Sequence, residues 1–307
     1  MQHAKKKTAV NNMNRCSFGA IAACLLVFLF ASFICQAQSR DSLVSKKRLR
    51  TFTIASASAY GVTLAGLNHL WYRHAARQSF HFFNDDAEWK QVDKLGHMYS
   101  SFYLSYGASR GLQWSHVPVR RSDLIGAMAG FLVLVPVEVF DGFSAAYGAS
   151  AGDLVADAAG ASLYLGQKLL WNEVRLIPKF SYHPTGYAAN RPDVLGDTPT
   201  SRLIKDYNGQ TYWLSADMDK FIRFPKWLNL AIGYGAQGMV FARDAQNTGA
   251  GYSSYRQYYL AIDIDLTAIK TRSKFVKSLI FVASMIRLPA PALEFNRNKV
   301  VFHSLYF

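Results

Sequence analysis

Four apolar segments of helix length fill much of the first 175 residues and constrain the fold more than any other feature. Each is near the roughly 20 residues that a helix needs to cross a bilayer core, and each is also long enough for a core helix. Most of them contain internal polar groups, such as Asn68 and Asp157, which are costly in lipid. The segments lie at about residues 51–72, 89–113, 124–140 and 153–171. The pattern predicts a helical bundle in the N-terminal part of the chain.

The first 37 residues have the plan of a secretory signal peptide. A basic stretch is followed by an apolar run over residues 18–34 and by small Ala37, after which cleavage is expected. An uncleaved anchor helix is the alternative. Cys35 is compatible with a lipoprotein, but Ile34 is bulky where a lipoprotein signal requires a small residue. All cysteines lie in this leader, at Cys16, Cys24 and Cys35, so the exported chain is expected to have no disulfide and no thiolate chemistry.

Charge indicates the side of the membrane and the kind of partner. After cleavage, the basic cluster at residues 46–50 would precede the first apolar segment on the exported side, against the positive-inside rule. We therefore expect the periplasm or the outer membrane rather than a polytopic inner-membrane protein. The formal net charge of +14 favours contact with an anionic membrane surface or polysaccharide. The basic residues are scattered and form no nucleic-acid-binding motif, so nucleic acid is not expected as a partner.

The composition changes at residue 178. Residues 178–210 are rich in Pro, Gly, Asn and Asp, and predict an irregular linker. Five aromatic and β-branched segments then predict strands at residues 211–218, 228–241, 255–269, 278–286 and 300–307. Five strands are fewer than the roughly eight of a one-chain membrane barrel, so a small sheet on the envelope side is preferred. The predicted α+β chain comprises a signal peptide (1–37), a basic linker (38–50), a helical domain (51–177), the irregular linker (178–210) and a β-rich region (211–307).

Three polar clusters border the apolar segments. Asp93 and His97 are four residues apart and share a helical face, while Lys94 lies about 100° around the helix. Glu138 and Asp141 also share a face, at the end of the most apolar segment, where Pro136 should kink the helix. A third acidic pair, Asp153 and Asp157, is again four residues apart. Ionisable groups in apolar surroundings are costly unless they are paired or used, so convergence of these faces would form a site.

Three interpretations of this polar set remain open. The first is a divalent metal site for Mg²⁺, Mn²⁺ or Zn²⁺, with His97, Glu138, Asp141 and Asp153 as ligands. The second is metal-free acid–base catalysis, in which crowded carboxylates raise one pKa and His97 moves a proton. The third is a structural network, in which Lys94 neutralises Glu138 or Asp153 and fixes the register of the helices. The candidate catalytic residues are Asp93, Lys94, His97, Glu138, Asp141 and Asp153.

The same residues resemble a family of predicted periplasmic or lipoprotein-like envelope proteins, DUF2279 or the YfiM-like family. The resemblance covers about residues 50–175. Its motifs are Phe80-His81-Phe82-Phe83-Asn84-Asp85 with Glu88-Trp89, Asp93-Lys94-x-x-His97, Glu138-x-x-Asp141-Gly142-Phe143-Ser144 and Gly148-x-Ser150-x-x-Asp153-x-x-Ala156-Asp157-x-x-Gly160. Parts of this pattern are also similar, more distantly, to the VanZ-like membrane family. The resemblance implies a location in the cell envelope and marks the polar set as one unit.

These observations favour an exported, envelope-associated protein of unknown activity, whose polar cluster is structural or binds a ligand. One alternative is a metal-dependent or acid–base hydrolase acting on a lipid or glycan of the envelope. Another is an outer-membrane assembly partner that pairs its β segments with another sheet. The sequence does not decide whether the protein is an enzyme, and a protein partner and the oligomeric state stay open.

Overall fold

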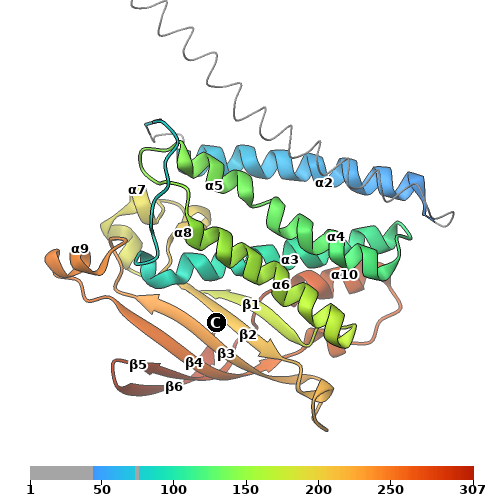
Figure 1. The fold of residues 1–307 in the computed structure, drawn as a ribbon. Coiled ribbons are helices and arrows are strands. Elements are labelled where there is room, and N and C mark those ends of the chain that lie inside the picture. The colour runs from blue at the N-terminus through green and yellow to red at the C-terminus, as the bar shows by residue number, and fades with distance from the viewer. Residues whose placement is uncertain (1–43, 73–75) are drawn as a thin grey trace, which may run out of the picture. The chain divides into compact units, whose positions relative to one another are not determined.

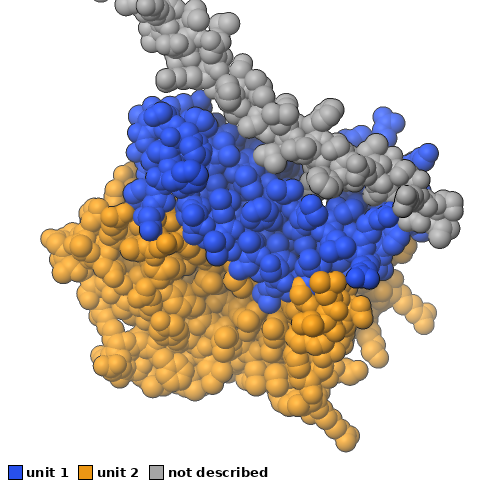
Figure 2. Space-filling view, in the orientation of Figure 1, with its two compact units in different colours: residues 1–84, 100–165 blue, residues 85–99, 166–307 orange. Residues whose placement is uncertain are grey.

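Figure 1 shows the computed structural model, which describes residues 44–72 and 76–307. The predicted signal peptide lies outside these residues. Figure 2 divides the chain into two compact units, unit 1 with residues 1–84 and 100–165, and unit 2 with residues 85–99 and 166–307. Helices fill the N-terminal half and a six-stranded antiparallel sheet the C-terminal part, which confirms the α+β prediction. The domain boundaries expected from the sequence differ from the unit boundaries and stay predictions.

Unit 1 is built from helices. Ser45 caps the first of them by accepting the Arg48 N–H, so residues 46–50 form its first turn, where the sequence predicted a linker. Buried Leu49 of this turn packs with Leu112 and Val117. The helices are α2 (Lys46–Leu67) with a π-helical turn (Asn68–Tyr72), the part of α3 (Val92–Trp114) from residue 100 onward, α4 (Val119–Leu132), α5 (Val135–Gly142) and α6 (Ala151–Trp171) up to residue 165.

The most apolar stretch is broken into α4 and α5. Pro136 stands at the start of α5, so the helix breaks before the proline instead of bending around it. Length and composition alone would let Val119–Gly142 cross a membrane, as they would for many buried core helices. Within unit 1, α4 lies very close to α3, because a Cβ at Gly130 would come within 2.0 Å of the Ser105 Oγ. Glycine is required at this approach.

Unit 2 is an antiparallel meander in which each strand pairs with the next. The sequence predicted strand at residues 278–286, and this was wrong, because a helix with a Ser273 cap covers most of that stretch. The two strands that the sequence missed, β1 and β5, each contain a proline that weakens their strand signal. The strands are β1 (Leu176–Tyr182), β2 (Gln210–Ala216), β3 (Leu228–Gln237), β4 (Tyr255–Ile264), β5 (Ala290–Asn296) and β6 (Lys299–Tyr306).

Short helical elements connect these strands. The predicted irregular linker contains the end of β1 and three short helical pieces, so it is more ordered than expected. The helical elements of unit 2 are the turn Trp89–Gln91 with the first part of α3, the last part of α6 from residue 166, the turns Tyr187–Asn190, Met218–Lys220 and Leu266–Ala268, and the helices α7 (Pro192–Leu195), α8 (Pro199–Lys205), α9 (Asp244–Gly249) and α10 (Lys274–Ala283).

The sheet buries the face that carries its charged groups together with aromatic and alanine side chains, and it exposes an apolar face. Ile232 and Leu260 point outward, with 60% and 48% of their surfaces exposed. Lys179 and Asp263 are fully buried on the opposite face. The sheet curls around this polar face, because Tyr306 of β6 is hydrogen-bonded to Thr211 of β2, four strands away. Leu260 and Ile262 alternate along β4 and share this exposed face.

Candidate functional site

Two buried carboxylates of unit 1 lie close together at the start of α6. Glu138 of α5 is 3% exposed and accepts the Ser150 N–H at 2.9 Å. Asp153, in the first turn of α6, is 7% exposed and its N–H donates to the Ser150 Oγ at 3.1 Å. A carboxylate oxygen of Glu138 lies within 4.8 Å of one of Asp153. Two buried negative charges at this distance repel each other unless positive charge compensates them.

One turn further along α6, Asp157 is fully buried. Its carbonyl oxygen accepts a hydrogen bond from the Ser101 Oγ at 2.7 Å, and Tyr164 stacks on Tyr106 of α3. The residue with the higher number on α3, Tyr106, therefore contacts the residue with the higher number on α6, Tyr164, and the lower-numbered pair, Ser101 and Asp157, also meet. Within unit 1, the two helices run side by side in the same direction.

The polar core of unit 1 contains a second acid, Asp123, whose role the sequence reasoning missed. It stands just before the apolar run 124–140, a position typical of a helix cap, but it lies inside α4 and is 4% exposed. It accepts hydrogen bonds from the Ser109 Oγ and the Tyr164 hydroxyl, both at 2.6 Å. Burial and the bond to Asp123 raise the pKa of Tyr164 well above its usual value. The sequence signal that could have indicated this polar core is the run of serines four residues apart on α3, at positions 101, 105 and 109.

Asp141, the other candidate of unit 1, is half-buried in the last turn of α5. The loop that follows it is held by His81, whose Nδ1 lies 3.1 Å from the Gly142 carbonyl oxygen and whose Nε2 lies 2.9 Å from that of Tyr147. Burial, followed by the negative charge of Asp141, raises the pKa of the Tyr147 hydroxyl. His81 thus orders the loop between α5 and α6.

In unit 2, Lys94 pairs with an acid that the sequence reasoning did not assign to it. Its Nζ lies 2.8 Å from the Asp85 Oδ1 and 3.5 Å from the Asp93 Oδ2. The two carboxylates approach within 4.8 Å of each other, and Lys94 supplies positive charge to both. The signal for Asp85 was its place in the Asn-Asp-Asp run just before α3.

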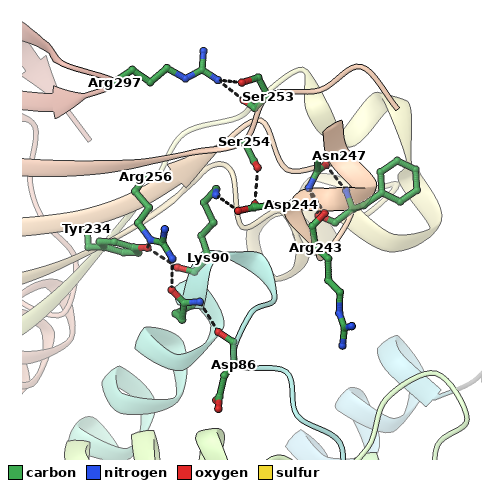
Figure 3. A network of polar contacts seen from close by, with 12 residues as sticks. Asp86, Lys90, Tyr234, Arg243, Asp244, Asn247, Ser253, Ser254, Arg256 and Arg297 are labelled. Atoms are coloured by element: carbon green, nitrogen blue, oxygen red, sulfur yellow. Dashed lines mark hydrogen bonds and ion pairs between the residues drawn. The ribbon is translucent and has the colours of Figure 1, made fainter. Parts of the chain in front are cut away.

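The segment that carries these groups is anchored to the sheet of unit 2 through Lys90. Figure 3 shows this network, in which the buried Lys90 Nζ lies 2.7 Å from the Asp244 Oδ2 and the Tyr234 hydroxyl donates to the Lys90 carbonyl oxygen. Trp89, Lys90 and Gln91 have φ values of 45°, 49° and 63°. Left-handed backbone costs about 1–2 kcal/mol per non-glycine residue, so these contacts hold a strained turn. The turn fixes where α3 begins.

His97 lies in the second turn of α3 and is half-buried. Next to it, a Cβ at Gly96 would come within 2.9 Å of the Tyr212 hydroxyl, so α3 packs closely on the sheet inside unit 2. The candidate residues are therefore distributed over both units, with Glu138, Asp141 and Asp153 in unit 1, and Asp93, Lys94 and His97 in unit 2. Their union in a single site stays a prediction.

Residues 81–167 match the model of a family described as predicted periplasmic lipoproteins (DUF2279). This confirms the resemblance, and it agrees with the prediction of an exported protein of the cell envelope. The match contains all the candidate residues discussed above. The VanZ-like similarity stays a prediction. No curated protein and no solved structure matches the chain.

Proposed function

We propose that this envelope protein binds a divalent metal ion between α5 and α6, through Glu138 and Asp153. The observation that carries the proposal is the approach of two buried carboxylates within 4.8 Å in unit 1. A cation between them would be attracted to both carboxylates. Each carboxylate would then contribute an oxygen ligand of the kind that Mg²⁺ and Mn²⁺ prefer. The ion would hold the two helices together, so the site acts in binding and in organising the helical unit.

The sequence also assigned His97 to the ligand set, and a nitrogen ligand would add Zn²⁺ to the ions accepted. The role of His97 stays a prediction from the sequence. Asp141 remains a proposed fourth ligand, and hydrolysis at this site remains a prediction from the sequence.

The test is thermal unfolding of the purified chain with and without Mg²⁺, Mn²⁺ or Zn²⁺. One of these ions should raise the melting temperature of the native chain, since ligands that bind only the folded state stabilise it. Glu138→Gln and Asp153→Asn should remove this rise. Asp123→Asn is the matched control, a buried acid of the same unit that accepts hydrogen bonds from hydroxyl and amide donors. It should lower the melting temperature but retain the metal-induced rise. Equal behaviour of all three variants would contradict the proposal.

A second candidate function, pairing of the sheet with a partner at the outer membrane, has support in β6. This strand is last in the sheet order, and Val300, Phe302 and Leu305 are each about two-thirds exposed. An apolar edge strand is a template for another strand. Membrane fractionation tests it: the native chain should be found with the outer membrane and Phe302→Pro should not. Recovery of the native chain only in the soluble fraction would exclude this function.

A further inference from the structure

Helix α10 of unit 2 presents an apolar stripe to its surroundings. The Ser273 Oγ caps the helix by accepting the Val276 N–H, and no residue of α10 is buried. Phe275, Leu279 and Val282 are 71%, 52% and 56% exposed. Their spacing of four and three residues places them on one helical face. A water-soluble helix normally turns such a face inward, so this stripe requires a partner.

The helix is fixed to the sheet at its C-terminal end. Met285 follows α10, and its carbonyl oxygen accepts the Phe180 N–H at 3.0 Å and the Tyr99 hydroxyl at 3.1 Å. Arg287 donates its N–H to the Phe180 carbonyl oxygen, and its guanidinium is buried with hydrogen bonds to the Tyr306 and Ala290 carbonyl oxygens. The hydrogen bonds of Met285 and Arg287 therefore fix the C-terminal end of α10, and with it the position of the stripe.

Charge around the stripe indicates the kind of partner. No Asp or Glu occurs between Asp265 and Glu294. Four exposed cations lie in or just before α10, at Lys270, Arg272, Lys274 and Lys277. A lipid leaflet with anionic headgroups offers both hydrocarbon for the stripe and negative charge for the cations, which is how interfacial helices bind.

We propose that α10 is an interfacial helix that docks unit 2 on an anionic phospholipid leaflet. Phe275, Leu279 and Val282 enter the boundary between headgroups and acyl chains. The cations of residues 270–277 contact the headgroup phosphates. This docking is independent of the proposed metal site, so failure of one leaves the other standing.

Hydrogen–deuterium exchange of the chain purified from the envelope tests the proposal directly. The amides of residues 274–283 should exchange several-fold more slowly when vesicles of 30% phosphatidylglycerol and 70% phosphatidylcholine are added. The amides of α8, at residues 199–205, serve as the internal control and should not change. Vesicle binding through another segment, with no protection of α10, would overturn the proposal, as would absence of binding. Equal protection by pure phosphatidylcholine would overturn the role of charge.

Co-sedimentation with the same vesicles separates the two contributions. Two double variants should each weaken binding of the chain to the vesicles at least about tenfold. They are Phe275→Ser with Leu279→Ser, and Lys274→Glu with Lys277→Glu. The matched controls are Leu203→Ser with Ile204→Ser on α8, and Arg223→Glu with Lys226→Glu, all exposed in unit 2. Both controls should bind as the native chain does. Equal loss in variants and controls would contradict a specific role of α10.

Discussion

Replacement of Lys179 by methionine should destabilise unit 2 strongly, because it leaves a carboxylate buried without its cation. The Lys179 Nζ lies 2.5 Å from the Asp263 Oδ2, and both side chains are essentially inaccessible, at 2% and 0% exposure. The ammonium also donates to the Ile264 carbonyl oxygen at 3.0 Å, and Asp263 accepts from the Ser215 Oγ at 2.6 Å. This ion pair is the clearest consequence of a sheet with its polar face inside.

The expected loss for Lys179→Met is about 3–5 kcal/mol, the usual cost of breaking a buried ion pair by removing one partner. The double variant Lys179→Met with Asp263→Leu removes both charges and should recover at least about 2 kcal/mol of that loss. The Ser215 hydroxyl then loses its acceptor, at about 1–3 kcal/mol, so recovery should be incomplete.

Urea unfolding, followed by tryptophan fluorescence to which the buried Trp213 contributes, measures these changes in the free energy of unfolding. Lys220→Met is the control, since Lys220 is 37% exposed and forms a surface ion pair with Glu173 at 3.4 Å. Solvent screening keeps such pairs at about 0–1 kcal/mol. If Lys179→Met costs no more than Lys220→Met, the polar interior of the sheet is refuted.

Three further predictions concern single side chains. Tyr164→Phe removes a buried donor from Asp123 and should cost about 1–3 kcal/mol in urea unfolding, and an unchanged midpoint would contradict this hydrogen bond. Burial and the hydrogen bond to the neighbouring Asp219 raise the pKa of Asp217 from 3.8 to about 7, so the folded chain holds a proton that the unfolded chain releases. Its contribution to stability should therefore fall as the pH rises from about 4 to about 7, and Asp217→Asn should flatten the pH dependence of the urea midpoint. Ile232→Ser, on the exposed apolar face, should change the free energy of unfolding by less than about 0.5 kcal/mol, and a loss above 2 kcal/mol would show that the face is covered.

The sequence predicted the elements of this chain well where one signal dominates. The helix at Ala151–Trp171 and the strand at Tyr255–Ile264 have clear helical and alternating patterns, and both were expected. Residues 278–286 were wrongly predicted as strand, because a short apolar run rich in Ile, Phe and Val favours strand. Its exposed apolar residues have helical spacing, and most of the run is helix. The orientation of the sheet could not be predicted, since alternation shows that two faces differ but does not show which one is buried.

The sequence predicted which residue types form the site better than it predicted which side chains contact one another. Glu138 and Asp153 do approach each other, as the convergence of their helices suggested. Asp85, which pairs with Lys94, lies in a loop, where no periodicity indicates the direction of a side chain. The role of Asp123 could not be predicted, because an acid just before an apolar run resembles a helix cap, while its donors come from α3 and α6.

Titration of the purified chain with Mn²⁺ tests most directly whether Glu138 and Asp153 bind a divalent metal ion. Electron paramagnetic resonance reports the free ion, so the bound fraction follows from the lost signal. We expect one Mn²⁺ per chain, at least tenfold weaker binding in Glu138→Gln, Asp153→Asn and His97→Ala, and unchanged binding in the exposed control Asp193→Asn. Absence of Mn²⁺ binding to the native chain, or binding that survives both Glu138→Gln and Asp153→Asn, would contradict the claim.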